Sequence, residues 1–117
     1  MKIQLRHASD GEMLFVLINQ AIPDIIYFDI DVPCRDGINC IVEIRKNKDL
    51  NKVPVIMFTE HEFKHYIKKA YENGANFYLL KTANIEQLTN YLKQVFSIEW
   101  RKSMYYPTFD QFVLRAL

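Results

Sequence analysis

The segment "PDIIYFDIDVPCRDG", residues 23–37, carries the pattern that decides the fold. An unbroken apolar run, residues 25–28, is followed at once by Asp29 and then by Asp31. An apolar run of strand length without polar alternation is typical of a strand buried on both faces, as in a parallel sheet. Acidic residues directly after such a strand are expected at the carboxyl edge of the sheet, where ligands of α/β folds bind.

Two further apolar runs have the same character, "VIMF" at residues 55–58 and "FYLL" at residues 77–80. A fourth run, "KIQLRH" at residues 2–7, alternates apolar and polar side chains and predicts a strand nearer an edge. Thr59 comes directly after the second run and Lys81 directly after the third. An acid, a hydroxyl and an amine are therefore expected to gather at one edge of the sheet.

Helical patterns separate these runs, which predicts a parallel sheet with helices on both faces. In the first helix, residues 9–21, an apolar stripe of Met13, Val16 and Leu17 is expected to face the core. Another helix is expected from about residue 62 to 73, ending at Gly74. The last predicted helix begins at Asn84, and its predicted buried face is formed by Leu88, Tyr91, Leu92, Val95 and Phe96.

The composition fits one domain, residues 1–100, followed by a tail, residues 101–117, that packs on it. The 117 residues carry a net charge of +1, which provides no field for nucleic acid or an acidic membrane surface. No apolar run reaches membrane-spanning length, and the start lacks a signal-peptide pattern. Cys34 and Cys40 are interpreted as reduced thiols, so the predicted location is the cytoplasm.

The stretch "HEFKH", residues 61–65, is the H-E-x-x-H pattern if it lies on a helix. His61 and His65 would then hold zinc, with Glu62 as general base, and the protein would be a zinc hydrolase. Against this, Glu86, the nearest acid available as a third ligand, falls on a different predicted helix. A solvated helix face with two titratable imidazoles is the expected outcome.

The same motifs resemble the receiver domains of two-component response regulators. Residues 23–37 are similar to the segment around the phosphoacceptor aspartate of that family, and Thr59 and Lys81 follow Asp29 at the family's separations. Tyr78 stands at the position of the family's switch aromatic, within "NGANFYLLK". The resemblance covers about residues 2–100 and implies a flavodoxin-like, three-layer α/β/α fold in the cytoplasm.

The resemblance also implies a role for each site residue. Asp29 would accept a phosphoryl group from a histidine kinase or phosphotransfer protein, while Lys81 and Thr59 would bind the phosphoryl oxygens. Asp29 and the backbone carbonyl of Asp31 would hold Mg²⁺. The protein would catalyse at most its own phosphorylation and dephosphorylation, and its output would pass to a downstream protein partner.

The chain departs from the family in ways that predict weak Mg²⁺ binding and impaired phosphorylation. The family's first strand, with its acidic pair, has no match in this sequence, which leaves four strands instead of five. Either the first strand and helix are absent or the start codon was assigned too late. Glu60 replaces a small residue and Thr82 a proline. The module is therefore expected to be phosphorylation-controlled or degenerate. In the alternative, Asp10, a partner chain or a missing N-terminal segment completes a competent Mg²⁺ site.

The loss of a strand and helix is also expected to expose apolar surface and an open strand edge, which predicts a homodimer. The tail is expected to shield part of that surface through Phe109, Phe112, Val113 and Leu114.

Overall fold

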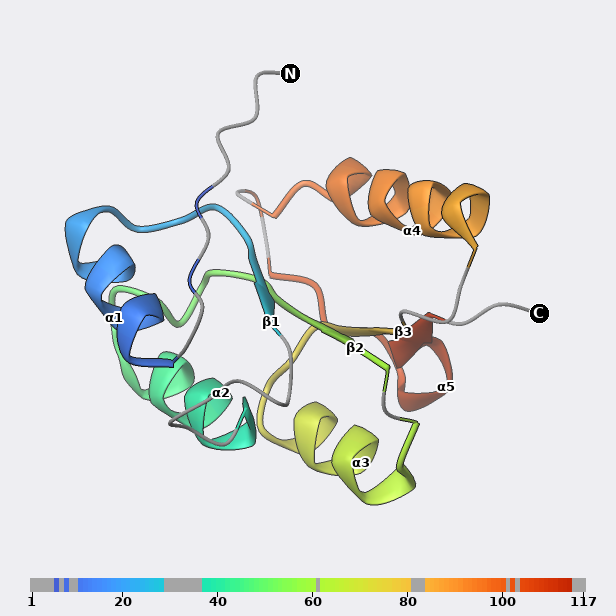
Figure 1. The fold of residues 1–117 in the computed structure, drawn as a ribbon, viewed down its shortest axis with the longest axis horizontal. Helices are drawn as coiled ribbons and strands as arrows, with labels where there is room; N and C mark the ends of the chain where they lie inside the picture. Colours follow the sequence, from blue (N-terminus) through green and yellow to red (C-terminus); the bar gives the residue numbers. More distant parts are fainter. Residues whose placement is uncertain are drawn as a thin grey trace.

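The computed structural model describes residues 6, 8, 11–28, 37–60, 62–80, 84–100, 102 and 104–114. Helices and strands alternate from α1 to α4, and a further helix and a short strand follow (Figure 1). In order they are α1 (Gly11–Gln20), β1 (Ile26–Phe28), α2 (Gly37–Lys46), β2 (Val55–Thr59), α3 (Lys64–Glu72), β3 (Phe77–Leu80), α4 (Ile85–Ser97), α5 (Phe109–Phe112) and β4 (Val113–Leu114).

The strands form one parallel sheet in the order β1-β2-β3-β4. Apart from Thr59 at the end of β2, the two middle strands carry apolar and aromatic side chains that are largely excluded from solvent: Val55, Ile56 and Met57 of β2 are fully buried, as is Tyr78 of β3. Side chains alternate between the two faces of a strand, so such burial requires cover on both faces. The predicted parallel α/β sheet of four strands is thereby confirmed.

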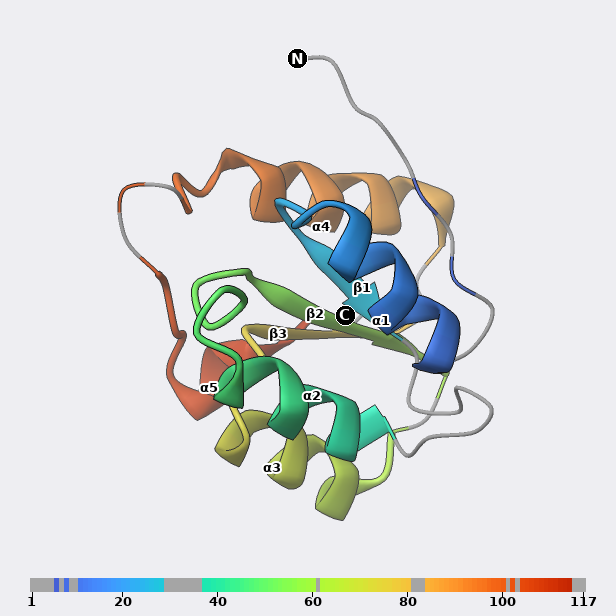
Figure 2. The same cartoon turned by 90° about the vertical axis from the view of Figure 1, so that its left-hand side faces the viewer.

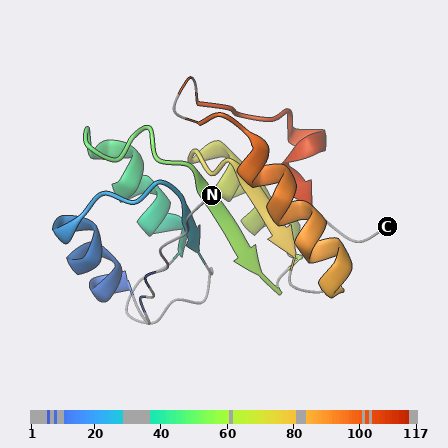
Figure 3. The same cartoon turned by 90° about the horizontal axis from the view of Figure 1, so that it is seen from above.

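The helices cover the two faces unequally. Viewed from the side, α2 and α3 lie below the sheet and α4 lies above it (Figure 2). One core cluster joins Ile18 of α1, Ile41 of α2 and Ile67 of α3 to one face of the sheet. A smaller cluster, centred on Val95 of α4, covers the other face. Viewed from above, α4 lies toward β3 rather than β1 (Figure 3).

The fourth strand differs from the one that the sequence predicted. Of residues 2–7 only Arg6 lies in the described part, and it is not in a strand. Its guanidinium instead donates hydrogen bonds to the carbonyl oxygens of Leu17 and Ala21, at 2.8 and 2.7 Å. The fourth strand is β4, in which Val113 pairs with Tyr78.

The predicted apolar stripe of α1 is wrong. Met13 and Val16 are 43% and 54% exposed, whereas Leu14, Phe15 and Ile18 pack against the core. Six consecutive apolar residues, 13–18, leave helical periodicity without a polar face to define the inward direction.

The predicted start of α4 is confirmed, as are four of the five residues of its predicted buried face; the fifth, Phe96, is partly buried but lies outside the cluster. The backbone N–H of Gln87 donates to the Asn84 side chain at 2.8 Å, and the Asn84 N–H donates to the Gln87 side chain at 3.2 Å. This reciprocal capping box fixes the first turn. Val95 is fully buried in the α4 cluster, where Leu88, Tyr91 and Leu92 are partly buried. None of the helices that the structure describes is both long and apolar enough to cross a bilayer.

Candidate functional site

Three strands end at one edge of the sheet around Thr59. Thr59 is the last residue of β2 and is fully buried. It pairs with Leu80, the last residue of β3, while Phe28, the last residue of β1, pairs with Met57. The next residues in the sequence after Phe28 and Leu80 are Asp29 and Lys81.

Three predicted site residues, Asp29, Asp31 and Lys81, lie outside the described residues, as does Asp10. The pairing of the three strands nevertheless shows at which level each strand ends. β3 ends level with Thr59, and β1 ends two residues short of that level. The carboxyl edge of a parallel sheet is where such folds bind ligands. A phosphoryl site at this edge would be built around the hydroxyl of Thr59.

The predicted switch aromatic, Tyr78, lies in the middle of this arrangement. It belongs to β3, is fully buried, and pairs with Met57 on one side and Val113 on the other. Its ring centroid lies 6.1 Å from that of Phe112, and Phe112 lies 5.0 Å from Tyr71 of α3. This aromatic contact was not anticipated from the sequence, because it depends on where the tail returns to the sheet.

The "HEFKH" stretch does not place Glu62 and His65 on one helix. α3 begins at Lys64, so Glu62 precedes it as an exposed residue, whereas His65 lies within it. The His65 ring is 4.2 Å from the ring of Tyr66. His61 is outside the described residues, among which no three His, Cys, Asp or Glu side chains are grouped to hold a metal ion.

A second polar centre occupies the opposite, amino edge of the sheet. Arg45 of α2 donates to the carbonyl oxygens of Gly74 and Val53, both at 2.8 Å, and to Asn76 Oδ1 at 2.9 Å. Burial lowers the pKa of Arg45, although the guanidinium retains its charge at neutral pH. Asn76 Oδ1 also accepts from the N–H of Val55 at 2.8 Å. This network ties α2 to the starts of β2 and β3.

Asn76 also holds the returning tail. Its Nδ2 donates to the carbonyl oxygen of Tyr105 at 2.8 Å and to the sulfur of Met104 at 3.2 Å. The side chain is fully buried, so all its bonds are made away from bulk water. In the sequence, Asn76 stands directly before a buried strand, and a structural role could have been predicted from that position.

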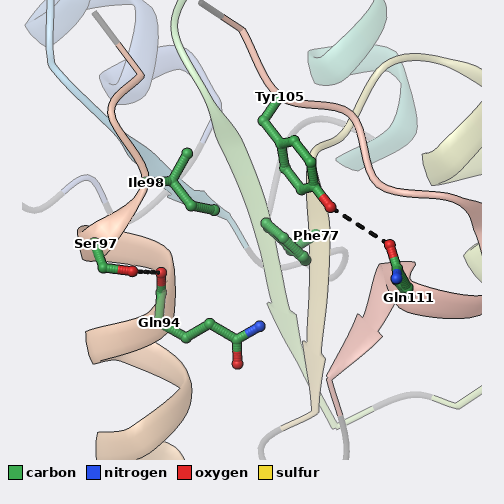
Figure 4. Close-up of a pocket in the computed structure, with 6 residues that line it drawn as sticks. All are labelled: Phe77, Gln94, Ser97, Ile98, Tyr105 and Gln111. Atoms are coloured by element: carbon green, nitrogen blue, oxygen red, sulfur yellow. Dashed lines mark hydrogen bonds between the residues drawn. The ribbon is translucent and has the colours of Figure 1, made fainter.

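A pocket of about 330 Å³ lies between α4 and the tail (Figure 4). Phe77 lines it together with the end of α4 and two residues of the tail, and the hydroxyl of Tyr105 donates to Gln111 Oε1 at 3.4 Å. None of the described residues that line this pocket is charged. It adjoins the start of β3, so it is separate from the edge that ends at Thr59. Its residues are Phe77, Gln94, Ser97, Ile98, Tyr105 and Gln111.

The chain belongs to the response regulator receiver domain family, whose model matches residues 1–93. It is 29% identical over 89 residues to response regulator Rcp1 of Synechocystis sp., a match covering 76% of this chain and 60% of Rcp1. It is 36% identical over 66 residues to the transcriptional regulatory protein KdpE of Staphylococcus aureus, covering 56% of this chain and 27% of KdpE. The chain therefore spans less than two thirds of each of these relatives.

Solved structures give the same family. The Mn²⁺-bound form of Rcp1 is 26% identical with a TM-score of 0.67, and the match covers 85% of this chain and 76% of that one. The phosphorylated cyanobacterial phytochrome response regulator RcpA is 25% identical with a TM-score of 0.70, covering 86% and 76%. The protein is thus a flavodoxin-like receiver domain of two-component signalling, and receiver domains are signalling modules. The zinc hydrolase alternative gains no support from these relatives.

Proposed function

We propose that Asp29 accepts a phosphoryl group and that Thr59 and Lys81 bind its oxygens. The supporting observation is the register: Asp29 and Lys81 directly follow the last residues of β1 and β3, the two strands that flank Thr59. The phosphorylated structure of RcpA, a relative of the same fold, is consistent with this assignment.

The reaction moves a phosphoryl group from a phosphohistidine of a histidine kinase or phosphotransfer protein. A carboxylate oxygen of Asp29 attacks the phosphorus, and the P–N bond breaks as the O–P bond forms. The electron pair of the broken bond goes to the imidazole nitrogen, which then takes a proton from water. The receiver contributes mainly position and charge: the Lys81 ammonium and Thr59 hydroxyl stabilise the phosphoryl oxygens.

Mg²⁺ fits the chemistry of the proposed ligands, which are a carboxylate oxygen of Asp29 and the backbone carbonyl of Asp31. When bound, it would neutralise charge on the phosphoryl group. Mg²⁺ requires about six oxygen ligands, and two from the protein leave most positions to water, so we propose weak binding. A solved structure of the relative Rcp1 is of its Mn²⁺-bound form, which is consistent with a divalent cation in a protein of this family.

We further propose that the state of the site reaches a downstream protein partner through the surface around Tyr78. Tyr78 lies two residues before the end of β3, and its ring packs against the tail rather than only against the central core. We place this exchange in the cytoplasm, the compartment in which a buried thiol such as that of Cys40 stays reduced.

Intact-mass spectrometry after incubation with acetyl phosphate and Mg²⁺ tests the proposed site. We expect slow, incomplete addition of one phosphoryl group, and none in Asp29→Asn. Glu60→Ala should accelerate labelling, because the exposed Glu60 carboxylate follows Thr59 and repels an incoming anion. Glu72→Ala, an exposed acid at the end of α3, is the matched control. Undiminished labelling of Asp29→Asn would refute the acceptor, and rapid, complete labelling of wild type would refute the impairment.

We also propose that two copies associate through the α1 side of the molecule. Met13 and Val16 lie about one helical turn apart on α1 and are half exposed, and Ile22, which follows the helix, is 57% exposed. Exposed apolar surface of this kind favours burial against a partner. A second copy would cover it with the same residues in a two-fold arrangement.

Light scattering at micromolar concentration tests the association. Val16→Lys should convert a dimer to a monomer, because it places a charge within the proposed interface. Ile85→Lys is the matched control, since Ile85 is an 84% exposed apolar residue at the start of α4. A wild-type monomer, or an equal effect of the two variants, would contradict the proposed surface.

A further inference from the structure

The last described part of the chain, residues 104–114, runs along the outer edge of β3 and is here named the C-terminal segment. It ends in β4, in which Val113 pairs with Tyr78 and Leu114 with Leu79 in a parallel register. Figure 1 shows α5 beside the end of β3, and the strand order places β4 on the side of β3 away from β2. The segment therefore lies on the sheet as an added strand.

Contacts at three levels along the sheet edge help to hold the segment. At the amino edge, Asn76 Nδ2 donates to the carbonyl oxygen of Tyr105 at 2.8 Å. Midway, the hydroxyl of Tyr71 donates to the carbonyl oxygen of Pro107 at 3.0 Å. Toward the carboxyl edge, the fully buried ring of Phe112 packs against the rings of Tyr71 and Tyr78.

Beneath the segment lies the kind of surface that binds extended peptides. β3 follows β1 and β2 in the strand order, and one of its edges pairs with β2. The backbone groups of its other edge can therefore form hydrogen bonds with one further strand. Beside that edge, the rings of Tyr71 and Tyr78 form the sides of an aromatic site for one large apolar residue. Strand addition next to such a site is a recurring mode of peptide recognition.

The segment contacts Tyr71, Asn76 and Tyr78, yet several of its large side chains stay at the surface. β4 contributes two residues to the sheet. Tyr105, Tyr106 and Phe109 remain 41%, 49% and 48% exposed, although all three are large apolar or aromatic side chains. Phe112 and Leu114 supply most of the apolar burial of α5 and β4. A short element held by few buried residues opens more readily than the central strands.

We propose that the C-terminal segment is a built-in competitor for a protein partner that docks on β3. The partner would add a strand parallel to β3 and would carry an aromatic residue followed two positions later by an aliphatic one, as Phe112 and Leu114 do. Docking requires the segment to leave, so the partner's affinity is reduced by the small fraction of molecules in which the site is open. This inference goes beyond the proposed function and does not depend on phosphorylation of Asp29.

Fluorescence anisotropy with a labelled synthetic peptide of residues 104–114 tests the competition on the full-length chain. Phe112→Ala in the chain weakens the internal competitor but leaves the docking surface unchanged. We therefore expect Phe112→Ala to bind the wild-type peptide at least tenfold more tightly than wild-type protein does. A peptide that itself carries Phe112→Ala should not bind.

Two more variants of the segment provide a control and a second test. Asp110→Ala changes an exposed residue of α5 and should bind the peptide as wild type does. Leu114→Ala removes the other buried anchor, should bind the peptide several-fold more tightly, and decides the test if Phe112→Ala does not fold. A variant that is folded by circular dichroism but binds no more tightly than wild type would show that the segment is a fixed part of the core.

Discussion

The two edges of the sheet differ in what lies against them. At the β3 edge, the chain adds its own strand, β4, and buries Phe112 against Tyr78. At the β1 edge, the structure describes a strand of three residues with no further strand beside it among the described residues. Next to it, α1 leaves Met13 and Val16 about half exposed.

The two edges of the sheet also differ in their hydrogen bonds. On the β3 side, Arg45 and Asn76 join α2, two strand starts and the C-terminal segment through hydrogen bonds between distant parts of the chain. On the β1 side, the hydroxyl of Tyr27 is buried without a hydrogen-bond partner in the described part of the chain. The β3 side is therefore expected to be the more stable part of the molecule.

The largest expected effect is that of Asn76→Ala. The substitution leaves the Val55 N–H and one Arg45 N–H without their acceptor and frees the carbonyl of Tyr105. Buried polar groups that lose their partners cost about 1–3 kcal/mol each, so we expect about 3 kcal/mol of destabilisation in total. Urea unfolding measures it, with Asn90→Ala on the exposed face of α4 as control. A loss under 1 kcal/mol would contradict the importance of this network.

A smaller loss is expected from Gly74→Ala. Gly74 has φ of +102°, a backbone conformation that side chains disfavour, and an added Cβ would lie 3.0 Å from Cγ of Arg45. Strain of this kind costs about 1–3 kcal/mol. Thermal unfolding should show the loss, whereas Glu72→Ala, two residues earlier and exposed, should stay within about 0.5 kcal/mol of wild type. Equal stability of the two variants would exclude strain at Gly74.

The smallest effect is expected on the β1 side, from Tyr27→Phe. Removing a buried hydroxyl that lacks a partner should leave stability at pH 7 unchanged or raise it by up to about 1 kcal/mol. Burial raises the Tyr27 pKa from 10.0 to about 12, so folding favours the neutral hydroxyl. The raised pKa has no effect on stability below pH 10, and wild type loses stability as pH rises toward 12, because the unfolded chain ionises first.

Unfolding measured between pH 9 and pH 12 should therefore show wild type losing stability relative to Tyr27→Phe. Tyr106→Phe, at a half-exposed ring of the C-terminal segment, is the control. A constant difference between wild type and Tyr27→Phe across this range would contradict the raised pKa.

Local sequence patterns predicted the centre of this fold. The buried strands at β1, β2 and β3, the helix start at Asn84 and the helix end at Gly74 all depend on neighbouring residues, and all three features are present. The spacing that links Asp29 to Thr59 and Lys81 identified the family, which the comparisons confirm. The roles of these site residues stay predictions.

Features that depend on distant contacts were missed. β4 is two residues long and exists because it pairs with β3, so no periodic pattern marks it. The inward face of α1 is set by what packs against Leu14 and Ile18, not by its own apolar spacing. Glu62 lies outside α3 because that helix begins two residues later, at Lys64.

Hydrogen exchange of the chain, followed by mass spectrometry, most directly tests whether β3, which β4 covers, is better protected than β1, beside which the described residues place no further strand. We expect slower exchange in β3 than in β1. We also expect Phe112→Ala to speed exchange in residues 109–114 and in β3 and to leave β1 unaffected. Equal protection of β1 and β3 in wild type, or loss of protection across the whole sheet in Phe112→Ala, would contradict this difference between the two edges.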